Sequence, residues 1–139
     1  MTVVFADTGA WLALLSRNDR HHKKALAFYE ELVAAGTRLL TTNYVVDEAA
    51  TRLRYDVDLS AALAFREMLD RATSSRRVRT AWIDAGMERE AWALLERHSD
   101  VKLSLTDATS AVVARRAKVG IVFGFDGDFR ALGFDLRPA

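Results

Sequence analysis

The 139-residue chain has no cysteine, a single proline and no apolar run long enough to cross a bilayer. Without cysteine there is no disulfide and no thiolate metal site, so carboxylates and histidines are the remaining metal ligands. The first residues lack a basic region followed by a cleavage site, so we expect a cytoplasmic protein with no membrane segment. Because Pro138 stands near the end of the chain, no proline-rich linker divides it, and we expect one domain over residues 1–139.

A strong excess of one charge is also absent. Twenty Lys and Arg stand against 19 Asp and Glu, which gives a net charge of +1 and does not by itself indicate a polyanion-binding protein. Basic residues do cluster locally, at 17–24 with one acid and at 71–83 and 115–118 with none. Clusters of this kind are most often solvated faces or the C-terminal ends of helices.

Hydrophobic periodicity divides the chain into alternating strands and helices. Strand patterns are predicted at 3–6, 37–42, 78–83, 120–125 and 134–136. Helical patterns are predicted at 10–16, 21–35, 84–98 and 105–118, and Trp92 and Leu95 of the helix at 84–98 are expected to face inward. A further helix is predicted after Asn43, which can cap it. Another begins at Asp58 or Ser60 and ends before the basic connection at 74–77. Strands that alternate with helices favour right-handed crossovers and a mostly parallel sheet covered on both faces. The predicted fold is therefore α/β, a three-layer α/β/α sandwich.

Two of the predicted strands end at a carboxylate. Val3–Ala6 runs into Asp7, and the apolar run at 120–125 leads into Asp126 and, two residues later, Asp128. The carboxyl ends of parallel strands share one edge of the sheet, which is where ligands bind in open α/β folds. Each acid taken alone also has a structural explanation, because Asp7 can cap a helix and Asp126 and Asp128 can form a turn.

Further acids stand early in two predicted helices. Asp107 lies three residues after Ser104, which is the spacing of a capping box, and Asp47 and Glu48 flank one apolar face at angles that periodicity does not separate. Three or four carboxylates gathered at one edge repel each other unless a cation neutralises them. An all-oxygen cluster suits Mg²⁺ or Mn²⁺, and the chemistry that follows is attack of water on a phosphodiester.

The order and spacing of these acids resemble those of a known family. The segments Phe5-Ala6-Asp7-Thr8, 41–48 with Leu53 five residues on, 105–108 and 123–129 look like the ordered acidic motifs of PIN-domain ribonucleases. Within that family the chain is most similar to the VapC-type toxins of type II toxin–antitoxin pairs. The resemblance covers the whole chain, so it implies a PIN-like fold.

Carried over to this sequence, the resemblance implies catalytic and metal-binding roles for four acids, with Mg²⁺ or Mn²⁺ as cofactor. They are Asp7, Glu48, Asp107 and Asp126, with Asp128 as an additional metal ligand. The resemblance selects Glu48 over Asp47, because the family acid is followed by small or apolar residues and a leucine. One departure is Gly124, which stands where the family often has Thr or Ser two residues before the last aspartate.

The implied function is a metal-dependent endoribonuclease, the toxin of a pair, that cuts RNA by attack of water. A cognate antitoxin that buries the acidic pocket or inserts a basic side chain, and a homodimer, are implied as well. We predict that basic residues at the rim of the site hold the RNA backbone. The sequence does not identify the partner surfaces, although the helical stretch at 44–72 is a candidate. The rim residues are Arg17, Arg20, Arg115 and Arg116.

Other readings of the same residues remain open. A non-catalytic PIN-like module that binds RNA or protein is one alternative, and a small-molecule phosphohydrolase is another, although a haloacid-dehalogenase-like enzyme needs an aspartate where Gly9 stands. Asp7-Thr8-Gly9 is also the tripeptide of aspartic proteases, whose all-β body the long helical periods exclude. His21 and His22 are predicted to be exposed polar residues, and the three tryptophans core or interface residues.

Overall fold

The structure is a computed structural model that describes residues 2–139. These residues form one five-stranded sheet in the order β3-β2-β1-β4-β5, in which every pair of neighbours is parallel. The strands are β1 (Val3–Ala6), β2 (Arg38–Thr42), β3 (Val78–Ala81), β4 (Ile121–Phe123) and β5 (Asp135–Arg137). The predicted α/β fold is confirmed, although β3 and β4 are shorter than the strands predicted at 78–83 and 120–125.

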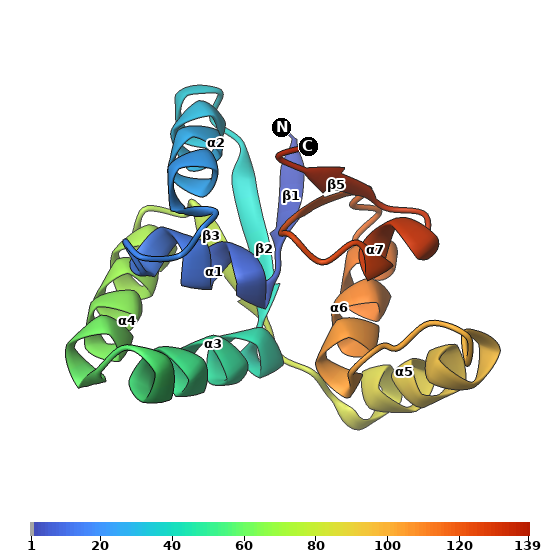
Figure 1. The fold of residues 1–139 in the computed structure, drawn as a ribbon. Helices are drawn as coiled ribbons and strands as arrows, with labels where there is room; N and C mark the ends of the chain where they lie inside the picture. Colours follow the sequence, from blue (N-terminus) through green and yellow to red (C-terminus); the bar gives the residue numbers. More distant parts are fainter. Residues whose placement is uncertain (1) are drawn as a thin grey trace.

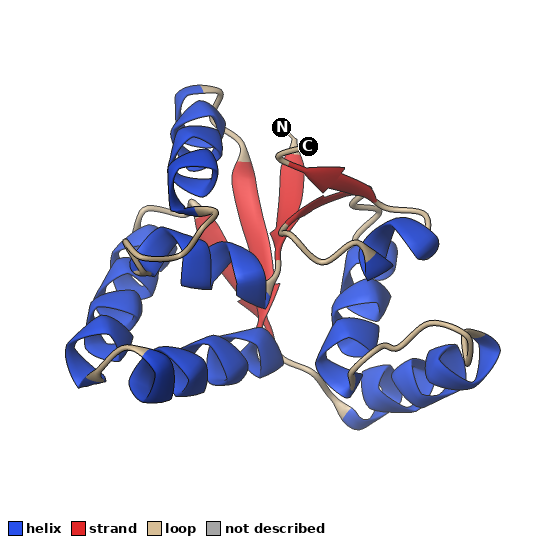
Figure 2. Ribbon diagram, viewed as in Figure 1, coloured by secondary structure: helices blue, strands red, loops and turns tan. Residues whose placement is uncertain are grey.

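Helices cover both faces of this sheet, which confirms the three-layer arrangement. In chain order they are α1 (Thr8–Leu15), α2 (His22–Ala34), α3 (Asn43–Asp56), α4 (Leu59–Ser74), α5 (Ala85–Arg97), α6 (Leu105–Arg116) and α7 (Asp128–Ala131). Figure 1 shows α1 to α4 on one side of the sheet and α5, α6 and α7 on the other, and Figure 2 shows the strands between the two groups of helices. None of the helices described is long and apolar enough to cross a membrane.

The core forms where α1 and α6 pack on the central strands. Trp11 is fully buried, its indole N–H donates to the Thr41 hydroxyl (3.4 Å), and that hydroxyl donates to the carbonyl oxygen of Ala6 (3.0 Å). The polar atoms of this core pair are therefore hydrogen-bonded, as buried polar groups must be. On the other face, α6 presents small buried residues such as Ala111 and Ala114, which allow a close approach to the sheet.

Three local predictions are wrong. Thr42, and not Asn43, caps α3 by accepting the N–H of Val45, while the Asn43 side chain accepts the N–H of Ile83 and so joins α3 to the end of β3. The strand predicted at 120–125 ends at Phe123, and the short helix α7 that follows has no counterpart among the predicted helices. Trp92 was expected inward but is 53% exposed, because Ala91 and Leu94 face the core and Trp92 is rotated by about 100° from Ala91.

Candidate active site

The order of the strands brings the two strand-terminal aspartates to adjacent positions. β1 pairs directly with β4, and the N–H of Asp7 donates to the carbonyl oxygen of Phe123 at 3.0 Å. Asp126 follows three residues after Phe123, so both aspartates stand at the carboxyl edge of the sheet. Helices α3 and α6 begin at the same edge and carry Glu48 and Asp107 there (Figure 1). The predicted convergence of four acids therefore has a direct geometric cause.

Electrostatic coupling shows how close these four carboxylates lie. Burial raises the pKa of Asp7 to about 7, the N–H of Thr8 opposes that shift, and repulsion from Asp107, Glu48 and Asp126 adds to it. Burial also raises the pKa of Asp107; hydrogen bonds from Ser104 oppose this shift, and repulsion from Asp126 and Glu48 adds to it. Each of the four carboxylates therefore repels at least one of the others, and a bound cation would reduce that repulsion.

Local hydrogen bonds place two of these acids. The Ser104 hydroxyl accepts the N–H of Asp107 and the Asp107 carboxylate accepts the N–H of Ser104, both at 3.0 Å, so the predicted capping box is present. The Asp126 carboxylate accepts the N–H of Asp128 at 2.9 Å, and Asp128 is the first residue of α7. Asp128 is not among the causes of the raised pKa of Asp7 or of Asp107, but this hydrogen bond holds it next to Asp126.

The structure also separates the two acids of α3 that periodicity left equal. Glu48 is half-buried and acts on both Asp7 and Asp107, whereas Asp47 is exposed. Beside Glu48 lies a hollow of about 450 Å³ between α3 and the first turn of α6, with Leu105 and Thr106 on its far wall. Of the four acids of the cluster, Glu48 is the one that lines this hollow.

The residues at Asp7 fit a divalent cation. Among the described residues, Asp7 Oδ1 and the neighbouring Thr8 hydroxyl are buried without a hydrogen-bond partner, which is costly unless a polar ligand completes them. Within residues 2–139, no three His, Asp or Glu side chains form a ready-made metal-binding group. The donor atoms at this edge are oxygens, a set that suits a cation that keeps several of its waters, as Mg²⁺ does.

Comparison with known proteins decides the family, since the PIN-domain model matches residues 4–135. The chain belongs to the PIN-domain family. It is 33% identical to the 23S rRNA-specific endonuclease VapC20 of Mycobacterium tuberculosis over 98% of this chain and 99% of that protein. It is 30% identical to a VapC ribonuclease of Archaeoglobus fulgidus, over 88% of this chain and 76% of that one.

Solved structures agree with the fold of this PIN domain. The crystal structure of VapC20, described as a sarcin–ricin-loop-cleaving toxin, matches with a TM-score of 0.81 over 94% of this chain and 95% of that one. VapBC2 from Rickettsia felis, bound to a DNA fragment from their promoter, matches over 98% of each chain with a TM-score of 0.71. At 12% identity, this second likeness bears on the fold alone.

Gly124 gives the buried aspartate of this PIN domain its space. A Cβ atom at position 124 would lie 3.2 Å from the Cβ and 3.6 Å from Oδ2 of Asp7. Asp7 is buried and follows β1 directly, so it has little freedom to move aside. Glycine at this position therefore lets the residue after β4 lie directly against Asp7.

We expect Gly124→Ala to destabilise the protein by about 1 to 3 kcal/mol, because the added methyl group overpacks the wall beside Asp7. Thermal unfolding in chelator measures this loss. Gly120→Ala is the matched control, since no atom of the described residues lies within 4 Å of a Cβ there, and it should leave the melting temperature near the wild-type value. Equal effects of the two substitutions would contradict the proposed crowding.

A basic loop of the PIN domain is held beside the acidic edge by an aromatic stack. The His21 ring lies parallel to Phe125, with centroids 4.1 Å apart, and Phe125 directly precedes Asp126. The prediction that both histidines are exposed is wrong: both are half-buried, and His22 Nδ1 lies 2.7 Å from the carbonyl oxygen of Ala13. Periodicity gave no sign of this contact, because His21 and Phe125 are distant in sequence. Arg17 and Arg20 stand on the same loop.

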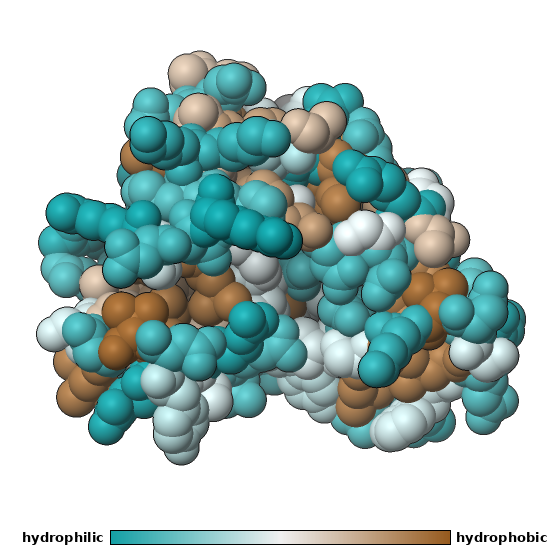
Figure 3. All heavy atoms as spheres, viewed as in Figure 1, coloured by the Kyte–Doolittle hydropathy of each residue, from teal (hydrophilic) through white to brown (hydrophobic). Residues whose placement is uncertain are grey.

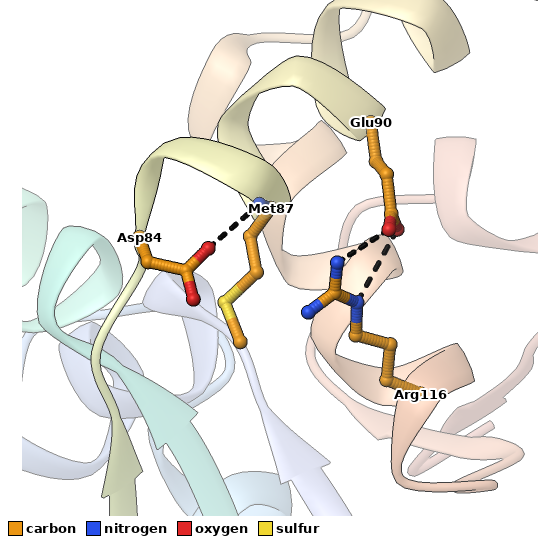
Figure 4. Close-up of polar contacts among 4 residues, drawn as sticks. All are labelled: Asp84, Met87, Glu90 and Arg116. Carbon is orange, nitrogen blue, oxygen red and sulfur yellow. Dashed lines mark hydrogen bonds and ion pairs between the residues drawn. The ribbon is translucent and has the colours of Figure 1, made fainter.

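The prediction that Arg115 and Arg116 lie at the rim is wrong. Asp107 is in the first turn of α6 and Arg116 is its last residue, which puts about 13 Å of helix between them. Arg116 pairs with Glu90 of α5 (Figure 4), and Arg115 donates to the carbonyl oxygen of Leu132 at 2.9 Å. These arginines join α6 to α5 and to the segment after α7. Figure 4 also shows Asp84 capping α5 through the N–H of Met87.

Proposed function

We propose that this PIN domain is an endoribonuclease toxin that hydrolyses RNA phosphodiester bonds with Mg²⁺ or Mn²⁺. The observation that carries the proposal is the coupled set of four carboxylates at one sheet edge, with an orphaned oxygen on Asp7. The names of the relatives favour RNA as the substrate class, and VapC20 makes ribosomal RNA the first substrate to test. Cytoplasmic location is part of the same proposal.

In this proposal Asp7, Glu48, Asp107 and Asp126 hold the cation, and Asp128, the first residue of α7, is an additional ligand. The chemistry that such a cation supplies in nucleases is activation of water and neutralisation of charge on the phosphate. With a pKa of about 7, Asp7 carries a proton part of the time at neutral pH and must release it when it becomes a ligand. Activity should therefore rise as the pH rises through 7.

Other residues of the chain would position the RNA. The N-terminal ends of α1 and α6 lie at the acidic edge, and the N–H groups of helix N-termini favour phosphate groups. Beside them, Arg17 and Arg20 line a hollow of about 400 Å³ on the loop that His21 holds against Phe125. In this arrangement the loop binds the backbone and the acids perform the cleavage.

The proposed activity should depend on added metal. We expect the purified chain to cut ribosomal RNA with Mg²⁺ or Mn²⁺, to lose the activity in excess chelator, and to regain it when the metal is restored. Gel analysis of end-labelled RNA measures the cleavage. Assays on a small phosphomonoester separate the phosphohydrolase alternative, since an endoribonuclease leaves that substrate intact. Undiminished cutting in chelator would contradict the metal-dependent mechanism, and binding without any cutting would favour the non-catalytic alternative.

We propose that a cognate antitoxin and a second copy of the chain are the partners. The helical stretch that is a candidate partner surface forms α3 and α4, where Tyr55, Val57, Leu59 and Leu63 are exposed. Apolar atoms gather over α3 and α4 in Figure 3, at its lower left. A groove of about 520 Å³ between these helices, floored by Phe65, suits an apolar helix of the antitoxin.

A further inference from the structure

A second hollow lies away from the acidic cluster, along the free edge of the sheet. We call it the edge pocket: about 590 Å³, bounded by the outer strand β3, the start of β2 and the C-terminal ends of α4 and α6. Its polar wall consists of Arg38, Arg76, Arg79 and two threonines, with Trp82 at one end. Among the described residues no acid lines it, whereas the neighbouring groove between α3 and α4, which shares Trp82 with the edge pocket, contains Asp47 and Asp70.

The three arginines of the edge pocket are not neutralised within the chain. Arg38, Arg76 and Arg79 are all exposed, and in the part of the chain that the structure describes their side chains make no hydrogen bond or ion pair. Other arginines do pair with acids: Arg52, Arg66, Arg71, Arg116 and Arg137. A guanidinium cluster without acids is the arrangement that binds phosphate groups.

Two basic residues flank this pocket in a backbone conformation that glycine prefers. Arg76 follows α4 with φ = 61°, and Lys118 follows α6 with φ = 57°. Each ends its helix in the same way, since the next N–H returns to the last helical turn, from Arg77 to Ala72 and from Val119 to Ala114. Any residue with a Cβ atom is strained at such a position. The chain thus carries a basic side chain on both sides of the pocket in spite of that strain.

Trp82 adds a flat apolar surface to the charged wall. Its side chain is 74% exposed, and the N–H of the next residue, Ile83, is bonded to Asn43 at 2.8 Å, which fixes the backbone at this point. An exposed indole beside guanidinium groups is how proteins bind single-stranded RNA, because a base stacks on the ring while phosphates lie on the arginines. Trp82 follows β3 at the carboxyl edge, the same edge that carries the acids.

We propose that the edge pocket is an RNA-binding exosite: Arg38, Arg76 and Arg79 hold phosphates and Trp82 stacks on an unpaired base of the strand being cut. The inference rests on the proposed ribonuclease function. β3 spans about 13 Å and points toward the acidic edge, so RNA lying along it would continue toward the catalytic acids. A dinucleotide has a single phosphodiester, so it cannot place that bond at the acids and a second phosphate on the arginines, which separates binding at the exosite from catalysis.

Binding is measured by fluorescence anisotropy of a labelled single-stranded RNA, in the full chain made inactive by Asp107→Asn. In that background we expect Arg38→Gln/Arg79→Gln to weaken binding about tenfold and to reduce the slope of log K against log salt by about 1.4. Trp82→Ala should weaken binding about tenfold and remove the quenching of tryptophan fluorescence by RNA. In the otherwise unchanged chain, both changes should raise KM for long RNA and leave kcat/KM for a dinucleotide unaltered.

Matched controls are available in the same chain. Arg54→Gln/Arg97→Gln removes the same charge from exposed sites, and Trp92→Ala removes another exposed indole. Control losses as large as those of the pocket variants would overturn the exosite. Competition by poly-glutamate as strong as that by RNA would also overturn it, because the pocket would then bind acidic peptides. A change from dimer to monomer on Trp82→Ala would overturn it as well, because Trp82 would then belong to the dimer interface. Absence of cutting by the unaltered chain, with binding still lost in the pocket variants, would instead refute the proposed activity alone.

Discussion

Replacement of Asp107 by Asn should lower kcat/KM for RNA cleavage about a thousandfold, which corresponds to about 4 kcal/mol of transition-state stabilisation. The substitution removes one negative charge from the proposed cation site. It leaves the fold intact, because the Asn oxygen can still accept the N–H of Ser104 in the capping box. Cleavage of a labelled RNA at saturating Mg²⁺ measures the loss, and circular dichroism checks the fold.

The two acids of α3 supply the matched control for that result. Glu48→Gln should reduce cleavage strongly, because Glu48 faces the cluster, whereas Asp47→Asn removes the exposed neighbour and should retain most of the activity. The same comparison applies to Asp126→Asn and Asp128→Asn, with the larger loss expected for Asp126. Full activity of Asp107→Asn, or a larger loss from Asp47 than from Glu48, would exclude the proposed assignment.

Asp7→Asn should change stability and activity in opposite directions. In chelator, we expect the free energy of unfolding of the wild-type chain to fall by about 4 kcal/mol between about pH 4 and pH 7, and most of that fall to be absent in the variant. Above pH 7 the metal-free variant should therefore be the more stable protein, although it lacks a proposed metal ligand and should not cut RNA. Urea unfolding at a series of pH values measures both curves.

The sign follows from the raised pKa of Asp7. Between an unfolded value of 3.8 and a folded value of about 7, the folded chain holds a proton that the unfolded chain has released, so stability falls as pH rises. The raised pKa of Asp107 acts in the same direction and leaves a smaller slope in the variant. Asp100→Asn, which removes an exposed carboxylate, should keep the full wild-type slope. Saturating Mg²⁺ should restore stability to the wild-type chain near pH 8.

Much of the fold and the acidic site could be predicted because both depend on short-range patterns. Alternation of apolar strands and amphipathic helices implied a parallel sheet, and parallel connections place every strand end and following helix start at one edge. Asp7, Asp107 and Asp126 needed no more than that rule to be candidates. Helix angle alone did not distinguish Glu48 from Asp47, since the two flank the same apolar face. The resemblance to the PIN-domain family selected Glu48, and packing against α6 gives the physical reason.

Predictions failed where long-range contacts determine the environment of a side chain. Arg115 and Arg116 looked like a basic surface, but the position of α5 and of the segment after α7 engages both. The sequence predicts an exposed His21, but in the folded chain its ring stacks on Phe125. The acid-free run at 71–83 has the pattern of a solvated face. In the folded chain, the start of β2 and the C-terminal end of α6 lie beside part of this run, and together they form the edge pocket.

The sequence by itself determined which acids the chain has, their order, and the sheet edge at which they meet, because periodicity and parallel connections are properties of the chain. Only the tertiary structure decided that Asp7 is buried with an unsatisfied oxygen and that Gly124 gives it space. The physical reason is that desolvation, repulsion and close packing depend on distances between segments that are remote in sequence, and those distances exist only in the folded chain.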